Sequence, residues 1–247
     1  MNNSIFYGKF YDLAFNGLND NLKKFWVENS KDNILELGCG TGKITIPLAN
    51  NGFEITALDN SEKMIKMGKK KIKNKQVKIN WILADMRNFN IDKKFSTVII
   101  PSNNLTHLIN RNDIESCFNS IKQHLKKDGK LIIDIFNPNL DILTRDSNKR
   151  YLFAKFKDPE TQKQIKVEEN NVYDKKRQIN NINYYYKLPN KDDEIKEKLS
   201  LRVYFPSEIN NLLHYNGFVI KEKYGDYDKN NFKSSSAKQL IICTLKD

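Results

Sequence analysis

Residues 34–42 read Ile-Leu-Glu-Leu-Gly-Cys-Gly-Thr-Gly, and this stretch predicts a buried strand that runs into a glycine-rich turn. Its two leucines belong to a short apolar run, as a strand covered on both faces requires. Gly38, Gly40 and Gly42 remove side chains where the backbone bends sharply and a ligand approaches it closely. We expect a helix to begin just behind the last glycine. The stretch is typical of a nucleotide-cofactor site, and a tight strand-to-helix turn without a ligand is the alternative.

The spacing of the glycines distinguishes between nucleotides. Dinucleotide sites use Gly-x-Gly-x-x-Gly, whereas Lys43 stands here where the third glycine would be. A P-loop ends in Gly-Lys-Ser or Gly-Lys-Thr, and that ending is also missing. The pattern therefore disfavours a pyrophosphate and, still more, a triphosphate.

With Glu36 in front, the nonapeptide resembles the first motif of the class I methyltransferases that depend on S-adenosyl-L-methionine (SAM). The resemblance implies that Glu36 and the turn residues Gly38, Cys39, Gly40 and Gly42 hold the methionine end of this cofactor. It also implies an α/β fold with a doubly wound, mostly parallel seven-stranded sheet, the Rossmann-like methyltransferase fold. The alternation of strand and helix patterns that follows the motif independently favours a parallel sheet with helices on both faces.

The second strand is expected at Glu54–Asp59, so that its last carboxylate stands 17 positions after Gly42. A carboxylate at this place accepts hydrogen bonds from both ribose hydroxyls of an adenosine. The alternative is that Asp59 only caps the next helix, a role that Asn60 and Ser61 also fit. We favour the ribose role and count Asn60 with the cofactor site.

The third strand is expected at Val77–Asp85, and the sequence Ala84-Asp85-Met86 at its end resembles the adenine-edge motif of the same family. This resemblance implies that the Asp85 carboxylate accepts from the exocyclic amine and that Met86 lies against the ring. An aspartate in an exposed turn is the alternative, and it fits less well because apolar residues directly precede it.

The fourth strand, Phe95–Pro101, leads into residues 102–108, where open sheets of this type place their chemistry. We count Ser102 with the cofactor site. His107 resembles a histidine near the acceptor in sugar-amine and other small-molecule methyltransferases, and its near-neutral pKa suits a proton acceptor. A structural role as a cap or hydrogen-bonding residue is at least as consistent with the sequence. The segment lacks the Asn/Asp-Pro-Pro-aromatic signature of enzymes that methylate exocyclic amines of nucleic-acid bases. It also lacks the Pro-Cys nucleophile that methylation of cytosine or uracil at C5 needs. Both classes of enzyme are therefore disfavoured.

Residues 4–29 are rich in aromatic side chains and predict one or two short helices that lie on the main domain. The pair Tyr11-Asp12 resembles the opening of a small-molecule methyltransferase branch in which such a pair sits over the cofactor pocket. Tyr11 is equally consistent with packing and with lining the site, and we include it with His107 as a candidate catalytic residue.

The alternation is interrupted after the fifth strand, Lys130–Phe136. Before that strand, Asn112 predicts the start of a helix and Gly129 its C-terminal cap. Residues 140–204 have strand-like alternation and charged turns, which predicts an inserted antiparallel sheet that covers the pocket mouth and sets the choice of acceptor.

We therefore expect residues 1–139 and 205–247 to form the SAM-binding domain with an N-terminal helical cover, and 140–204 to form the inserted β lid. Within the insertion, the successive residues Tyr184, Tyr185 and Tyr186 should alternate between faces. In the family the last strand, here 239–245, runs antiparallel to the others.

Composition excludes several classes of protein. Three cysteines without metal-ligand spacing indicate reduced, structural thiols and predict no metal site. The sequence shows no export signal and no apolar run long enough for a bilayer, so we expect a cytoplasmic protein without a membrane partner. The formal net charge of +12 comes mostly from scattered lysines, with one dense cluster at 66–78 that we interpret as a solvated helix face and loop.

Together these features predict a SAM-dependent methyltransferase that transfers a methyl group to an amine or hydroxyl of a small molecule by in-line displacement. We do not expect a nucleic-acid partner, and we expect a monomer or homodimer. An RNA methyltransferase that uses the basic surface and a non-catalytic SAM-binding protein remain the alternatives.

Overall fold

The computed structural model describes residues 5–15, 19–73, 76–188 and 194–246, with side chains described from residue 10 onward. The chain divides into two compact units. The larger contains Leu18–Asn137 and Tyr204–Asp247, and the smaller contains Met1–Gly17 and Pro138–Val203. Helix α1 (Ile5–Ala14) is thus grouped with the inserted sheet, and helix α2 (Asp20–Asn29) is grouped with the larger unit.

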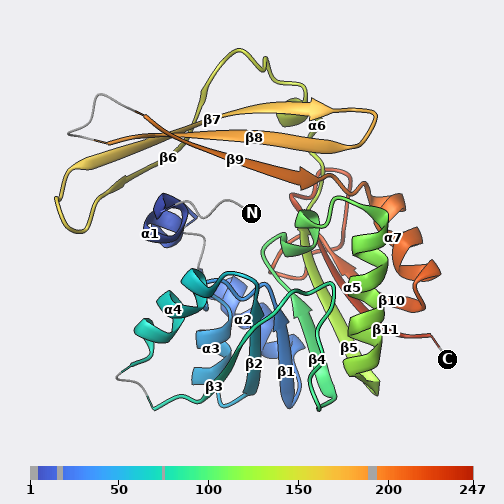
Figure 1. The fold of residues 1–247 in the computed structure, drawn as a ribbon. Helices are drawn as coiled ribbons and strands as arrows, with labels where there is room; N and C mark the ends of the chain where they lie inside the picture. Colours follow the sequence, from blue (N-terminus) through green and yellow to red (C-terminus); the bar gives the residue numbers. More distant parts are fainter. Residues whose placement is uncertain (1–4, 16–18, 74–75, 189–193, 247) are drawn as a thin grey trace. The chain divides into compact units, whose positions relative to one another are not determined.

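The larger unit is an α/β fold around a seven-stranded sheet (Figure 1). Its elements in chain order are α2 (Asp20–Asn29), β1 (Asn33–Leu37), α3 (Thr45–Asn50), β2 (Glu54–Asp59), α4 (Glu62–Lys71), β3 (Ile79–Leu83), β4 (Phe95–Ile100), the 3-10 helix η1 (Asn104–His107), α5 (Arg111–His124), β5 (Leu125–Phe136), α7 (Pro206–Tyr215), β10 (Phe218–Tyr224) and β11 (Lys238–Leu245).

The strand order is β10-β11-β5-β4-β1-β2-β3, and β11 pairs antiparallel with both of its neighbours. The pairs of β1 with β2 and with β4 are parallel, and the order reverses between β1 and β4. At such a switch point the loops beyond the carboxyl ends of the two strands diverge and leave room for a ligand. The predicted fold class and the antiparallel last strand are confirmed.

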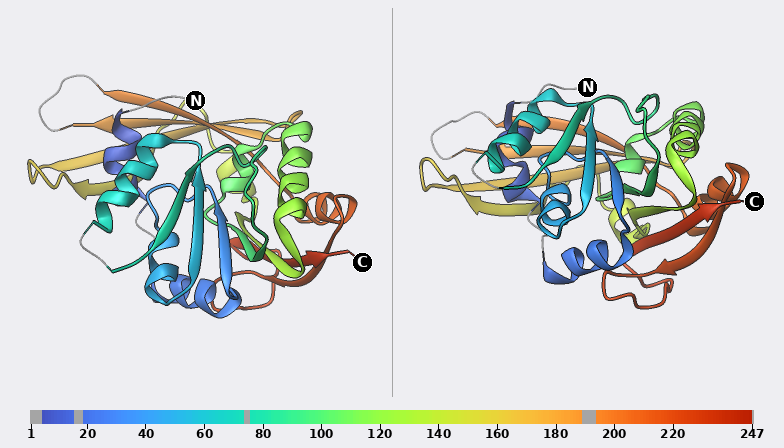
Figure 2. Two further views of the ribbon diagram at one scale, coloured as in Figure 1. Left: turned by 60° about the horizontal axis from the view of Figure 1, so that its bottom comes forward. Right: turned by 90° about the horizontal axis from the view of Figure 1, so that it is seen from below.

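Alternate residues of the central strands feed two separate cores, because successive side chains of a strand point to opposite faces. On β5, Leu131, Ile133 and Ile135 pack with α5 and α7. Ile132 packs instead with α2 and with residues of α3. Helices therefore cover both faces of the sheet, as Figure 2 shows from two directions.

Two predicted boundaries of the α5 region are wrong. The N-cap position is Asn110 rather than Asn112. The helix ends at His124, and Gly129 lies inside β5 instead of capping the helix, because Leu125 already pairs with Phe95 of β4. The third strand is also shorter than predicted, at Ile79–Leu83.

The smaller unit is built on an antiparallel sheet in the order β6-β7-β8-β9. Its elements are α1 (Ile5–Ala14), α6 (Leu140–Leu143), β6 (Tyr151–Lys157), β7 (Gln164–Asp174), β8 (Ile179–Lys187) and β9 (Ile195–Arg202). Phe10 of α1 packs into an apolar cluster with Tyr184 and Tyr186, while Tyr185 faces the other way and stacks with Arg150. The predicted alternation of the three tyrosines is confirmed.

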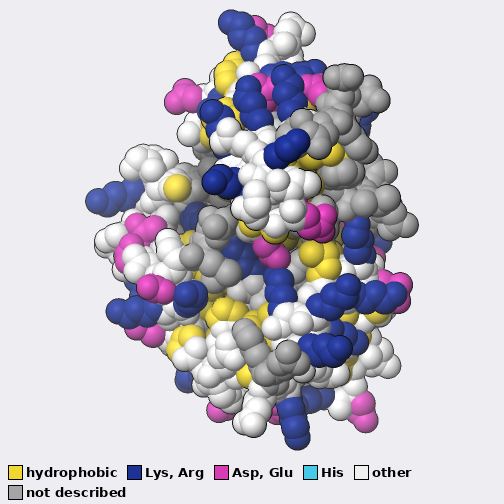
Figure 3. All heavy atoms as spheres, turned by 90° about the vertical axis from the view of Figure 1, so that its left-hand side faces the viewer, with side chains coloured by type: hydrophobic (Ala, Val, Ile, Leu, Met, Phe, Trp, Pro, Cys, Tyr) yellow, Lys and Arg dark blue, Asp and Glu magenta, His cyan; other side chains and the backbone are white. Residues whose placement is uncertain are grey.

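No helix in the described part of the chain combines the length and the apolar character that crossing a membrane requires. Lysine and arginine side chains are interspersed with acidic ones on the face shown in Figure 3. Interspersed charges of both signs are typical of an ordinary solvated surface.

Candidate cofactor site

The turn after β1 uses three glycines in a conformation that other residues rarely adopt. Gly38, Gly40 and Gly42 have φ values of +78°, +54° and +80°. The backbone N–H groups of Gly38 and Cys39 donate to Leu58 O at 2.8 and 3.0 Å, and that of Gly40 donates to the Asp59 carboxylate at 2.7 Å. The first three N–H groups of the turn are therefore bonded to β2.

Glu36 lies on the strand that feeds this turn, and its side chain is buried. Thr45 Oγ1 donates to its carboxylate at 2.6 Å. Burial raises the pKa of Glu36 to about 8, the negative charge of Asp59 adds to the rise, and the Thr45 hydrogen bond opposes it. A cation near this carboxyl would favour its ionised form.

Asp59 ends β2 and holds the glycine turn in place. One carboxylate oxygen accepts from Gly40 N, and the other accepts from Ser61 N at 2.8 Å. Burial raises the pKa of Asp59, and the backbone hydrogen bonds of Ser61, Gly40 and Asn60 oppose the rise. The cap of α4 is Ser61, whose hydroxyl accepts from Met64 N, so capping is not the role of Asp59. Asn60 is exposed beside it.

The helix α4 approaches the turn closely because Gly68 has no side chain. A Cβ at Gly68 would lie 2.5 Å from the Trp81 ring, and one at Gly42 would lie 2.8 Å from the same ring. In the 66–78 cluster, Lys71 is exposed, as predicted, and its ammonium also reaches the turn. Lys71 donates to the carbonyl and the hydroxyl of Thr41 at 3.1 and 2.8 Å.

Cys39 is buried within the turn. Burial, followed by the charges of Glu36 and Asp59, raises the pKa of its thiol well above the usual range. The thiol is therefore protonated at neutral pH, and Cys39 contributes shape rather than a nucleophile.

Asp85 and Met86 follow β3, next to the end of β2, where Ala84 N donates to Asp59 O at 3.1 Å. The Asp85 carboxylate is bound by the Arg87 guanidinium at 2.6 to 3.0 Å, and this hydrogen bond lowers the pKa of Asp85. Met86 is half-buried against the core. The adenine role of this pair remains a prediction, with Arg87 as a partner that the sequence reasoning did not include.

The loop after β4 bends over the glycine turn. Ser102 and Asn103 have φ values of 55° and 65°, and Asn104 then begins η1. The Asn104 side-chain nitrogen donates to Gly38 O at 2.7 Å and, more weakly, to Leu37 O at 3.4 Å. The structure thus brings the loop that contains Ser102 against the motif at the end of β1.

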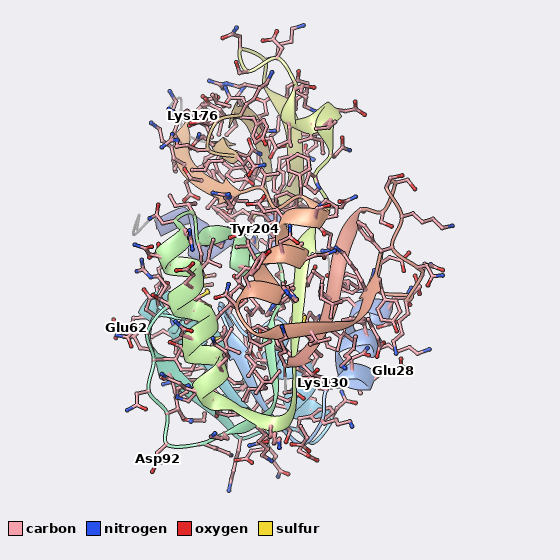
Figure 4. All side chains as sticks on the ribbon, turned by 90° about the vertical axis from the view of Figure 1, so that its right-hand side faces the viewer. Glu28, Glu62, Asp92, Lys130, Lys176 and Tyr204 are labelled. Carbon is pink, nitrogen blue, oxygen red and sulfur yellow. The ribbon has the colours of Figure 1, made fainter. Side chains whose placement is uncertain are left out.

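His107 ends η1, and the following Leu108 is fixed by Tyr204, whose hydroxyl donates to Leu108 O at 3.0 Å; Figure 4 labels Tyr204. His107 keeps exposed surface, yet the protein atoms around its ring desolvate it and lower the pKa of the imidazole. The ring is therefore neutral at pH 7 and able to accept a proton. Tyr11 lies on α1 in the smaller unit, where its ring packs on Phe15, and its role in the site remains a prediction.

This donor set fits SAM better than a phosphate-bearing cofactor. A pyrophosphate site needs backbone N–H groups aimed at the ligand, and those of Gly38, Cys39 and Gly40 are already bonded. A phosphate would further disfavour the ionised forms of the Glu36 and Asp59 carboxyl groups, whereas an ammonium or a sulfonium favours them, and both groups can accept from ribose hydroxyls. No cluster of metal-ligating side chains occurs among the described residues.

The comparison with protein families agrees with this chemistry. Residues 34–129 match the model of a methyltransferase domain. The part of the chain from β1 into β5 is therefore similar to a methyltransferase domain. A Bacillus subtilis relative named "Putative methyltransferase YqeM" is 34% identical over 143 residues, which are 53% of this chain and 58% of that protein. A ubiquinone biosynthesis O-methyltransferase of Rickettsia akari is 32% identical over 108 residues, 44% of this chain and 41% of that protein.

The chain spans about half the length of the curated relatives it matches. Solved structures share the methyltransferase fold over nearly the whole chain. A SAM-dependent methyltransferase from Clostridium acetobutylicum aligns with a TM-score of 0.81 at 19% identity, covering 96% of both chains. The sugar N-methyltransferase KedS8 from Streptoalloteichus aligns with a TM-score of 0.71 at 15% identity, covering 96% of this chain and 93% of the other.

Sequence reasoning missed three residues: Asn104, which donates to Gly38, Arg87, which binds Asp85, and Asp134, which accepts from Ser102 N. Asn104 stands inside the segment that was singled out, and its position after the fourth strand was the available signal. A surface hollow of about 350 Å³ at residues 90–94 and the end of α5 lies before β4, at the amino ends of the strands. It is therefore separate from the site at the carboxyl ends.

Proposed function

We propose that the protein transfers the methyl group of SAM to an amine or hydroxyl of a small molecule. The observation that carries the proposal is the glycine turn between two buried or largely buried carboxyl groups, Glu36 and Asp59, with its first N–H groups turned to β2. SAM, when bound, supplies a methyl group on a sulfonium, which a nucleophile displaces in line. The protein then needs to bind SAM, to orient the acceptor toward the methyl group and to take a proton from the acceptor.

In this proposal Glu36 and the residues from Gly38 to Gly42 hold the methionine end, since an ammonium needs acceptors and this stretch supplies a carboxyl group and backbone carbonyls. Asp59 accepts from the ribose hydroxyls with the lone pairs that its backbone partners leave, because each carboxylate oxygen has about two. Asn60 and Ser102 flank these positions. Asp85 accepts from the exocyclic amine of the adenine, and Met86 lies against the adenine ring.

The names of two similar proteins bear on the acceptor class. KedS8 is named a sugar N-methyltransferase, and the Rickettsia relative is named an O-methyltransferase, so the comparisons are compatible with either acceptor atom. Both names refer to small-molecule chemistry, which favours a metabolite over RNA. We propose that the four-stranded unit sets the choice of acceptor, because its strands have no counterpart in the strand order of the methyltransferase sheet.

His107 is the proposed proton acceptor. Its pKa is lowered by burial, so the neutral imidazole predominates at pH 7. Among the described residues, no side chain or backbone group forms a hydrogen bond with its ring nitrogens, which favours the catalytic role over a structural hydrogen bond. Tyr11 is proposed to orient the acceptor.

The test uses methyl-labelled SAM with three separate pools: cationic metabolites, neutral metabolites and RNA. We expect label in a metabolite pool and none in RNA. Titration calorimetry with SAM accompanies the assay, and it separates a protein that binds SAM without transferring methyl from one that does not bind it. Label that enters RNA, with a rate that falls steeply as salt rises, would contradict the small-molecule proposal.

A further inference from the structure

The turn after β4 holds two successive residues in the left-handed region. Ser102 has φ 55° and Asn103 has φ 65°. For side-chain-bearing residues this conformation is strained, and it persists only where surrounding contacts enforce it. Asparagine tolerates it, whereas serine has no such preference. Ser102 therefore needs an outside restraint.

The restraint comes from the carboxyl end of β5. Asp134 accepts from Ser102 N through its carboxylate at 3.0 Å and from Asn103 N through its backbone carbonyl at 2.9 Å. In return, the Asn103 side-chain oxygen accepts from Phe136 N at 2.7 Å. Three hydrogen bonds thus join the turn to two residues of one strand.

Asp134 is a fully buried carboxylate whose other partners come from the last part of the chain. Lys238 Nζ lies 2.8 Å from one of its oxygens, and the Tyr227 hydroxyl donates to the other at 2.7 Å. Lys238 also lies 5.1 Å from the centre of the Tyr227 ring. We name Asp134, Tyr227 and Lys238 the Asp134 cluster. Lys238 and Tyr227, like the backbone N–H of Ser102, donate to the Asp134 carboxylate.

We infer that the Asp134 cluster is a positioning device for SAM: it fixes Ser102 and Asn103 in the left-handed turn and thereby sets Asn104 against Gly38. The link to Gly38 is short, because Asn104 directly follows the turn and donates to Gly38 O at 2.7 Å. Asp134 is a positioning residue and not a catalytic one. This inference rests on the proposed function, in which Gly38 and Ser102 belong to the cofactor site.

The first variant is Asp134→Asn, which keeps the size of the side chain and loses its charge. The carboxylate accepts hydrogen bonds with two oxygens, whereas an asparagine side chain accepts with only one. Its NH₂ group would face the remaining donors and could not accept from them. We expect SAM binding by calorimetry to weaken about tenfold to a hundredfold, the range for one lost hydrogen bond to a charged group. Hydrogen exchange at the Ser102 and Asn103 N–H groups should accelerate.

The control is Thr97→Val, in β4, the strand that leads into the turn, and near the end of that strand that is farther from the turn. Thr97 is buried, and its hydroxyl bonds with the backbone of Lys31 on both sides, at 2.9 and 3.2 Å. This variant should unfold at a lower temperature with an unchanged Kd for SAM. It separates a loss of stability from a loss of positioning.

A double-variant cycle gives the sharper test. Glycine adopts positive φ without strain, so a turn with Ser102→Gly no longer needs the restraint from Asp134. Because Ser102 belongs to the proposed cofactor site, Ser102→Gly alone is the reference: adding Asp134→Asn to it should weaken SAM binding much less than adding Asp134→Asn to the wild type, while the melting temperature falls in both cases. If Asp134→Asn does not fold, Lys238→Gln replaces it. That variant keeps a donor but removes the cation, and it should weaken SAM binding about fivefold.

Unchanged SAM affinity and unchanged exchange at Ser102 in both the Asp134 and Lys238 variants would overturn the inference. An equal loss of affinity in Thr97→Val, or a loss on adding Asp134→Asn that is as large in Ser102→Gly as in the wild type, would also overturn it in favour of a purely structural role. A wild-type protein that binds no SAM would instead contradict the proposed function, and the exchange rates would still report whether Asp134 holds the turn.

Discussion

The Asn104 side-chain amide lies against Gly38, donating to its carbonyl at 2.7 Å, and it occupies the space that a side chain at Gly38 would need. A Cβ built on Gly38 would lie 2.5 Å from Asn104 Cγ. Two elements far apart in sequence are thereby packed without a gap at the switch point of the sheet. The glycine is required by its φ of +78° and by this contact together.

Gly38→Ala should therefore abolish detectable SAM binding and destabilise the domain by about 1 to 3 kcal/mol. Both effects have the same origin, namely the strained φ and the clash with Asn104. Calorimetry with SAM and chemical denaturation measure them. The double variant with Asn104→Ala should recover part of the stability, since it removes the clash and leaves the strain. A double variant no more stable than Gly38→Ala would show that the contact does not matter.

Glu36 should make the stability of the protein depend on pH. Its folded pKa of about 8 lies above the ordinary value of 4.5, so between these values the folded state keeps a proton that the unfolded chain releases. The free energy of unfolding attributable to Glu36 is therefore fully present below about pH 4.5 and declines as pH rises toward about 8. Glu36→Gln should remove this decline, because glutamine still accepts from Thr45 and has no proton to lose.

Denaturation of the wild-type protein and of Glu36→Gln at pH 5 and at pH 8 measures this effect. We expect the variant to gain stability relative to the wild type at pH 8, and the difference between the two proteins to shrink at pH 5. A difference of the same size at both pH values would contradict a raised pKa. Saturating SAM should reduce the decline in the wild type, because a bound cation favours the ionised carboxyl.

Asp59→Asn tests the ribose assignment. The carboxylate accepts from Gly40 N and Ser61 N in the structure, and the proposal adds the ribose hydroxyls. Losing hydrogen bonds to a charged acceptor should weaken SAM binding about a hundredfold or more. Ser61→Ala is the matched control, since it removes the cap of α4 and should cost about 1 kcal/mol of stability with little change in affinity. Equal SAM affinity in the wild type and Asp59→Asn would remove Asp59 from the site.

The sequence predicted the sheet and the cofactor turn well because both depend on local patterns. Apolar runs determine the strands, and the three glycines and Asp59 have positions set by backbone geometry alone. Gly129 shows where this stops: it has the form of a helix cap, but pairing of Leu125 with Phe95 carries the strand through it. Local preference was overridden by a contact across the sheet.

The residues that surround the motif were harder to predict for the same reason. Arg87 reaches Asp85 from two positions away, which no motif spacing requires. Asp134 meets Lys238 across 104 positions of sequence, through the antiparallel pairing of β5 and β11. Asp134 in an apolar strand was a visible signal of a buried charge, but its partner Lys238 could be identified only from the register of the β5–β11 pairing.

His107→Gln tests the proton acceptor and depends on an assay with a methylated product. Burial lowers the pKa of His107, so in the wild type the neutral base should predominate above a midpoint that lies below the usual 6.5. The turnover rate should therefore rise with pH through that midpoint and then level off. In the variant the rise should disappear and turnover should fall about a hundredfold or more, the usual range for a lost general base. SAM affinity should change little, which distinguishes a proton acceptor from a residue that shapes the cofactor site.

His124→Gln serves as the control: that ring is buried and bonded to Ser120 O and Ile91 N, so its loss should lower stability and leave the pH profile of turnover intact. A His107 variant with wild-type turnover at every pH would show that an acceptor loses its proton to water or to another group.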